Sequence, residues 1–350
     1  MTGRLYAGIV WGALIGACTT AAPTEEDPPG QPVQDLVPTH ALSDPVPFTY
    51  LGLSGGLYPS GSAMPAPHRS AGLTRALAVR PLDANGAPSS SGKIVLLSIG
   101  MSNTTQEFCN RQANGQCSAG TFVQQALADP AVQQTSLLLV DGAAGGQSAG
   151  TWLTPDAANY TRVRDTRLAP AGVTEQQVQV AWVKVANPGP SSQLPGPNAD
   201  AYNLATQIGT IVRTLRIRYP NLQLVFLSNR TYGGYATTTL NPEPYAYESG
   251  FAVKWVIEAQ IRQMAGATVD PRAGNLDYNT VAPWLGWGPD LWANGTTPRT
   301  DGHFWARQDF GADGTHPSSS GVQKVGRLLL DFLKQSPHAR CWFLIGGQCS

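Results

Sequence analysis

The chain has 350 residues, 23 basic and 23 acidic side chains, and a charged share of 13%, which is about half of the usual share in globular proteins. A formal net charge of zero provides no basic surface for nucleic acid, and the length suffices for one large domain or two small ones. The 38 glycines and 28 prolines indicate long loops around a modest set of helices and strands.

The first residues have the pattern of an export signal. Arg4 supplies a positive charge, and the apolar run over residues 5–17 is too short to span a bilayer as a helix. The run ends in Leu-Ile-Gly-Ala-Cys18, which resembles the signal of bacterial lipoproteins. The resemblance implies cleavage before Cys18 and a lipid on this cysteine, which would hold the protein on a membrane without a spanning helix. An ordinary signal peptide, cut near Ala21 or Ala22, is the alternative.

The same resemblance implies an outer-membrane lipoprotein, periplasmic or at the cell surface, because Thr19 rather than aspartate follows the cysteine. Residues 19–47 are rich in Pro, Thr and acidic side chains and lack periodicity, so we expect a disordered tether there. We expect a single domain beyond the tether. Its parts are a loop-rich lead-in over 48–92, a core over 93–335 and a tail over 336–350.

The core alternates between strand-like and helix-like segments. An apolar run over residues 94–99 predicts a buried strand of a parallel sheet. Further strands are predicted over 136–140, 178–185 and 222–227, and a fifth over either 267–270 or 281–285. Helices are predicted over 121–128, 200–218, 250–263 and 319–333. This alternation predicts an α/β protein with both faces of the sheet covered. The lead-in is expected to hold a strand within 73–82 and to cover an edge of the sheet.

The cysteines are odd in number, and lipidation of Cys18 would leave four: Cys109, Cys117, Cys341 and Cys349. Four cysteines allow three pairings. Two short local loops, 109–117 and 341–349, are the simplest of these. An exported protein meets an oxidising compartment, in which such disulfides form.

Ser102 follows the strand predicted over residues 94–99, at the carboxyl end where open α/β sheets place their ligands. The sequence Gly-Met-Ser-Asn around it resembles the first block of the SGNH hydrolases, also called GDSL-type esterases, with Met101 in place of that family's usual aspartate. The resemblance covers residues 92–333. It implies that Ser102 is a nucleophile. It also implies a flavodoxin-like three-layer α/β/α sandwich with a parallel sheet of about five strands.

An aspartate and a histidine lie three residues apart just before the last predicted helix, in Asp313-Gly-Thr-His316-Pro. Within a turn, the carboxylate can orient the imidazole as a general base for a serine. The segment resembles the last SGNH block in sequence and in position. The resemblance implies that His316 is the base and Asp313 its partner. His303, beside Asp301, is the competing pair.

Two further segments resemble the blocks that form the family's oxyanion hole. Gly146 follows the strand over 136–140 and corresponds to a glycine that donates its backbone N–H; we prefer it to Gly145. Asn187 follows the strand over 178–185 and corresponds to an asparagine that donates its side-chain amide. Asn229, after the next strand, is a rival for this role.

Two other serines fit the Gly-x-Ser-x-Gly pattern of a nucleophile elbow, Ser54 and Ser148. No predicted strand leads into Ser54, and residues 141–145 separate Ser148 from the strand before it, so Ser102 is preferred. The sequence contains no Cys/His cluster of zinc-site spacing and no phosphate-binding glycine loop. We therefore expect neither a metal nor a cofactor.

The resemblance implies an exported serine esterase that hydrolyses carboxylic esters through an acyl-enzyme. Habits of the family, together with Trp284, Trp287 and Trp292 in a predicted long loop over 271–300, make acetyl esters of carbohydrate a candidate substrate. Two alternatives stay open. One is an O-acyltransferase that uses the same residues. The other, which Met101 favours, is a non-catalytic surface binding lipoprotein on an esterase fold.

Overall fold

The computed structural model describes residues 38–350. The predicted signal segment, Cys18 and most of the predicted tether lie outside the described residues. No helix in the part that the structure describes is long and apolar enough to cross a membrane. Ala41 and Leu42 are only 2% and 1% exposed, so the domain begins before residue 48 and includes the last residues of the predicted tether.

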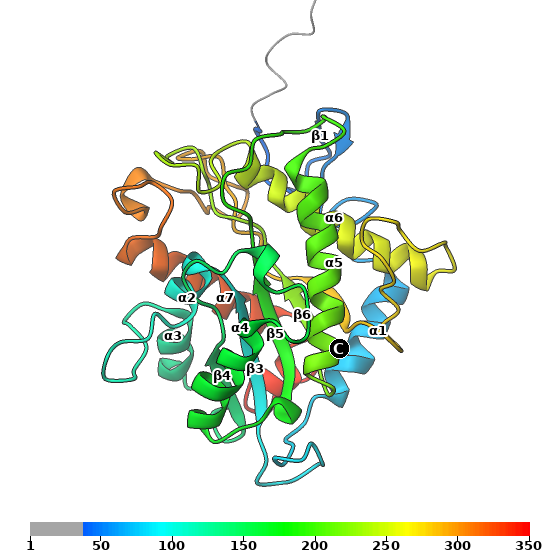
Figure 1. The fold of residues 1–350 in the computed structure, drawn as a ribbon, viewed down its shortest axis with the longest axis vertical. Coiled ribbons are helices and arrows are strands. Elements are labelled where there is room, and N and C mark those ends of the chain that lie inside the picture. Colours follow the sequence, from blue (N-terminus) through cyan, green and yellow to red (C-terminus); the bar gives the residue numbers. More distant parts are fainter. Residues whose placement is uncertain (1–37) are drawn as a thin grey trace, which may run out of the picture. The chain divides into compact units, whose positions relative to one another are not determined.

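A five-stranded parallel sheet forms the centre of the domain, in the order β4-β3-β5-β6-β7 (Figure 1). Its strands are β3 (Ile94–Gly100), β4 (Leu137–Asp141), β5 (Val178–Lys184), β6 (Leu224–Leu227) and β7 (Trp284–Trp287). The chain passes from β3 to β4 on one side and then crosses to β5 on the other side of β3. This reversal opens a crevice at the carboxyl ends of the strands, where α/β sheets bind ligands.

Helices cover both faces of the sheet, which confirms the predicted α/β sandwich. On one face pack α4 (Ala158–Val163), α5 (Asp200–Arg218) and α6 (Tyr245–Met264). On the other face pack α1 (Ala66–Ala78), α2 (Ser102–Phe108), α3 (Phe122–Ala128), α7 (Ser319–Gln335) and α8 (Arg340–Phe343). Alternate residues of β3 enter the two cores: Val95 and Leu97 face the first set of helices, Ile94 and Leu96 the second.

The lead-in contains a helix, α1, where a strand was expected within 73–82. The buried positions of this helix are His68, Gly72 and Ala76, which lie four residues apart but form no hydrophobic pattern. Gly72 allows α1 to approach the edge strand β7, because a Cβ there would lie 2.6 Å from the ring of Trp284. Apart from α1, the lead-in forms a short hairpin, β1 (Thr49–Tyr50) with β2 (Leu53–Ser54).

The predicted loop over 271–300 contains the edge strand β7, which overlaps the second of the two alternatives for the fifth strand. Trp284, Trp287 and Trp292 are all buried, at 0%, 3% and 1% exposure. These rings therefore pack the core, and none of them lines the cavity that contains Ser102. The predicted tail is also part of the fold, because Trp342 and Phe343 of α8 are buried.

Glu248 of α6 is a buried carboxylate that joins two distant segments. Its Oε1 accepts hydrogen bonds from the Tyr50 hydroxyl, at 3.1 Å, and from the Leu194 backbone N–H, at 3.0 Å. The side chain is almost fully shielded from solvent. Burial raises the pKa of Glu248 from 4.5 to about 7.

We expect Glu248→Gln to stabilise the protein at alkaline pH. The native carboxyl binds a proton between its unfolded pKa of 4.5 and its folded pKa of about 7, so wild-type stability falls as pH rises through this window. The amide keeps an acceptor and carries no charge. Urea unfolding at about pH 8.5 should show a gain of about 1–2 kcal/mol, which vanishes near pH 4.5. Equal stability of the two proteins at about pH 8.5 would contradict this account.

Candidate active site

Ser102 is the first residue of α2, and only one residue separates this helix from the end of β3 at Gly100. The close packing of Gly100 makes this short connection from strand to helix possible. A Cβ on Gly100 would lie only 2.2 Å from the Lys184 carbonyl oxygen and 2.3 Å from Thr104 Oγ1. The strand end and the new helix therefore meet β5 at a distance that only glycine allows. The predicted nucleophile thus projects at the carboxyl edge of the sheet.

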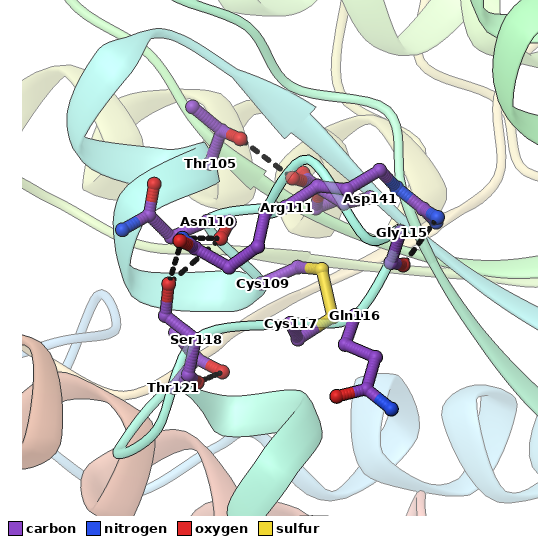
Figure 2. Close-up of a disulfide and its surroundings, with 12 residues drawn as sticks. Thr105, Cys109, Asn110, Arg111, Gly115, Gln116, Cys117, Ser118, Thr121 and Asp141 are labelled. Carbon is purple, nitrogen blue, oxygen red and sulfur yellow. Dashed lines mark hydrogen bonds between the residues drawn. A yellow bond between two sulfur atoms is a disulfide. The ribbon is translucent and has the colours of Figure 1, made fainter.

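Three polar side chains in the first turn of α2 fasten the helix to its surroundings. Asn103 Nδ2 donates to the Thr315 carbonyl at 2.8 Å, and Thr104 Oγ1 donates to the Lys184 carbonyl at 2.7 Å. Thr105 Oγ1 donates to Asp141 at the end of β4, at 2.6 Å (Figure 2). The sequence of α2 is polar because these side chains bind two strand ends and the loop before α7, and for that reason no helix was predicted there.

The segment after α2 is closed by the disulfide Cys109–Cys117 (Figure 2). Just after this loop, Ser118 Oγ donates to the Asn110 carbonyl at 2.9 Å. A second disulfide, Cys341–Cys349, closes the chain end after α8. The structure therefore has one of the three possible connectivities, the one that consists of two local disulfides.

His316 reaches Ser102 from the loop before α7, across 214 positions of sequence. Ser102 Oγ lies 2.8 Å from His316 Nε2, and His316 Nδ1 lies 2.5 Å from Asp313 Oδ2. Asp313 Oδ1 accepts the backbone N–H groups of Thr315 and His316, both at 3.0 Å. Partial burial would raise the pKa of Asp313, but these hydrogen bonds from His316 and the two N–H groups lower it. The carboxylate is therefore a fixed, ionised partner for the imidazole.

The turn between Asp313 and His316 depends on Gly314. Its φ is +67°, and a Cβ there would lie 1.7 Å from the Tyr235 carbonyl oxygen. Any other residue would push the turn away from the segment that follows β6. The glycine thus fixes the geometry of the Asp-His pair.

A cavity of about 80 Å³ lies beside Ser102 and His316, and Gly146 and Asn187 both line it. Asn187 Nδ2 donates one hydrogen bond to Gln207 Oε1 of α5, at 2.6 Å. A primary amide has two N–H groups, so the second one is left for a ligand. The structure thus brings together all five residues that the sequence assigned to catalysis and to the oxyanion hole.

Gly145, the alternative to Gly146, is not part of the cavity lining. Asn229 is buried and uses both ends of its amide elsewhere: Nδ2 donates to Asp290 at 2.7 Å, and Oδ1 accepts the Leu291 N–H at 2.8 Å. It lies outside the cavity lining and has a structural role.

Of the two rival serines, Ser148 lines the same cavity as Ser102. Among the hydrogen bonds of residues 38–350, none joins a histidine ring to Ser148 or to Ser54. Neither serine therefore has a base.

The competing pair, His303 and Asp301, lies at a separate cavity of about 830 Å³. Asp301 pairs there with Arg299, at 2.5 Å. Burial, followed by the nearby Arg299 charge, lowers the pKa of His303 to about 4. No serine hydroxyl is hydrogen-bonded to this imidazole in the described part of the chain.

A buried ion pair that no sequence motif reveals lies in the helix of Ser102 and the neighbouring strand β5. Lys184 ends β5 and Glu107 lies in α2; both side chains are 0% exposed, with Nζ 2.7 Å from Oε1. Burial lowers the pKa of Lys184 to about 8, against the opposing effect of Glu107. No local pattern could have revealed a pair whose members are 77 positions apart.

No protein-family model matches the chain, and no curated protein sequence matches it. Among solved structures, it is similar to a candidate SGNH hydrolase from Slackia heliotrinireducens, at 14% identity over 69% of this chain and 100% of that one, with a TM-score of 0.33. It is also similar to an extracellular lipase from Streptomyces rimosus, at 14% identity over 68% and 97% of the two chains, with a TM-score of 0.35. A carbohydrate esterase family 2 enzyme from Corynascus thermopiles matches at 11% identity over 69% and 66%, with a TM-score of 0.36.

Proposed function

We propose that the protein is a serine hydrolase of the SGNH type that cleaves carboxylic esters. The observation that carries this proposal is the contact of Ser102 Oγ with His316 Nε2 at 2.8 Å, with Asp313 behind the imidazole. A serine hydroxyl, an oriented base and a small open cavity are what two-step acyl transfer requires.

In the first step, Ser102 Oγ attacks the ester carbonyl and gives its proton to His316 Nε2. Asp313 accepts a hydrogen bond from the Nδ1–H of His316 and stabilises the imidazolium. The free amide N–H of Asn187, the Gly146 N–H and the Ser102 N–H meet the negative oxygen of the tetrahedral intermediate. The intermediate collapses, the C–O bond to the alcohol breaks, and the alcohol leaves with the proton from His316. Water then attacks the acyl-enzyme by the same route and releases the acid.

We also propose that the chain is exported and anchored through a lipid on Cys18. Two disulfides in the described residues support an oxidising compartment. The tryptophans that suggested carbohydrate are buried and give no support to a sugar substrate.

The wild-type protein is expected to hydrolyse p-nitrophenyl acetate and to react with a fluorophosphonate, because an activated serine attacks both reagents. After reduction and trypsin digestion, the label should lie in the peptide of residues 94–111, which contains Ser102. A label in the peptide of residues 112–162 would indicate Ser148. Absence of both turnover and label would indicate a binding protein.

Sugar acceptors added to the same assay distinguish hydrolysis from transfer. Free acetate as the product supports the esterase. An acetylated sugar in its place would identify an O-acyltransferase.

A further inference from the structure

Arg230 is a buried cation in the wall of the active-site cavity. It follows β6, is 3% exposed and lines the same cavity as Ser102 and His316. Within residues 38–350 its guanidinium forms no ion pair, and the buried Nε and Nη1 atoms have no hydrogen-bond partner. A buried charge without a partner is costly, so such groups are normally paired in folded proteins.

The carboxylates around Arg230 are already engaged with other groups. Asp313 binds His316, and Glu107 binds Lys184. Glu243 accepts hydrogen bonds from the Trp292 indole N–H at 2.7 Å and from a backbone N–H at 2.9 Å. The protein therefore brings three acidic side chains near this cation without satisfying its donors.

The other buried cations of the described chain are matched. Lys184 has both oxygens of Glu107 within hydrogen-bond distance. Arg299 lies between Asp290 and Asp301. Arg162, Arg167 and Arg216 also have a buried nitrogen without a partner, but these side chains are only partly buried and none of them lines the active-site cavity. Among the almost fully buried cations of residues 38–350, Arg230 is the unmatched one, and it lines the cavity beside Ser102.

Two more polar atoms of the cavity lining lack a partner. Asn241 Oδ1 and Thr315 Oγ1 are both buried, and no described residue binds them. The lining thus presents a cationic donor beside acceptor oxygens, a set that a small anion with a neighbouring N–H or O–H group would satisfy.

We propose that Arg230 binds a carboxylate of the substrate, so that the preferred esters carry this anion close to the scissile bond. The inference rests on the proposed function and names a substrate class for it. A guanidinium matches a carboxylate with two parallel N–H bonds, and the match gains strength where water is excluded. The cavity volume of about 80 Å³ suits a small charged group.

The carboxylate can belong to the acyl part or to the alcohol part of the ester, and two matched pairs separate these sources. Monomethyl succinate and methyl succinamate differ in charge on the acyl side. Acetoxyacetate and acetoxyacetamide differ in charge on the alcohol side. In one pair the wild-type kcat/KM should favour the carboxylate by about 10-fold to 100-fold.

Arg230→Met should abolish this ratio, and Arg230→Lys should retain part of it, because the charge remains while the planar fork is lost. The matched control is Arg327→Met on α7, whose side chain is 63% exposed and pairs with Asp331. This control should leave the ratio unchanged. Equal wild-type rates on both members of both pairs would overturn the proposal. An Arg230→Met variant that slows both members equally would do the same, since the arginine would then act on the oxyanion or on folding.

A binding experiment keeps the inference separate from the proposed function. The melting temperature of the wild-type protein should rise with succinate and not with succinamide, and Arg230→Met should lose this response. If anionic and neutral esters are turned over at equal rates, the proposed anion site is contradicted and the proposed esterase function is not. If no ester is turned over and succinate still binds, the esterase fails and the anion site stands.

Discussion

Ser102→Ala is expected to lower kcat for p-nitrophenyl acetate by about 10⁵-fold to 10⁶-fold, to a level set by the remaining oxyanion donors. The substitution removes the only hydroxyl that the described structure holds against an imidazole, at 2.8 Å from His316 Nε2. Without it, no acyl-enzyme forms, and only water in the cavity can attack. The measurement is a steady-state assay on protein whose melting temperature matches that of the wild type.

Ser148→Ala is the matched control, because Ser148 lines the same cavity and no histidine of residues 38–350 is hydrogen-bonded to it. It should change kcat by no more than a few-fold. Asp313→Asn tests the role of the acid and should lower kcat by about 10⁴-fold, since the amide can hold the wrong tautomer of the imidazole. An inactive Ser148→Ala beside an active Ser102→Ala would show that the nucleophile is assigned to the wrong residue.

Lys184→Met is expected to destabilise the protein by about 3–5 kcal/mol, because it leaves the Glu107 carboxylate buried and unpaired. Both side chains are fully shielded, and both oxygens of Glu107 contact Nζ. The pair joins the helix of Ser102 to the strand before Asn187. Urea unfolding monitored by tryptophan fluorescence measures the loss.

The double variant Lys184→Met/Glu107→Leu should recover most of this stability, since apolar side chains of similar size replace a buried ion pair at little cost. Lys334→Met is the control: its pair with Asp129 is partly exposed, at 31% and 16%, and should contribute at most about 1 kcal/mol. If the double variant were as unstable as the single one, the stability of the fold would depend on the charges of Lys184 and Glu107 themselves.

The central sheet was predictable because buried parallel strands consist of apolar runs, a property of a few adjacent residues. The predicted strand over 94–99 and the helix over 200–218 correspond to β3 and α5 almost to the residue. By contrast, α1 was mistaken for a strand. Its buried stripe of His68, Gly72 and Ala76 contains no large apolar side chain, and its position depends on a close approach to Trp284.

Some residues of the candidate site could likewise be predicted from the sequence, and others could not. Ser102 and His316 were visible in the sequence because short motifs at strand and helix ends carry them. The sequence could not decide between Asn187 and Asn229, because the two residues follow neighbouring strands in similar turns. Asp290 and Leu291, about 60 positions further along the chain, hold the amide of Asn229 outside the cavity lining, whereas Asn187 is part of that lining.

Local sequence thus determined the order of the strands along the chain, the helices α3, α5, α6 and α7, and the motifs that carry Ser102 and His316. It did so because each of these depends on a pattern within a few turns of chain. Only the tertiary structure decided that the tryptophans fill the core, that Lys184 has a partner and that Arg230 has none among residues 38–350. The reason is physical: burial and charge pairing are set by side chains that arrive from distant segments, and no stretch of sequence contains both members of such a contact.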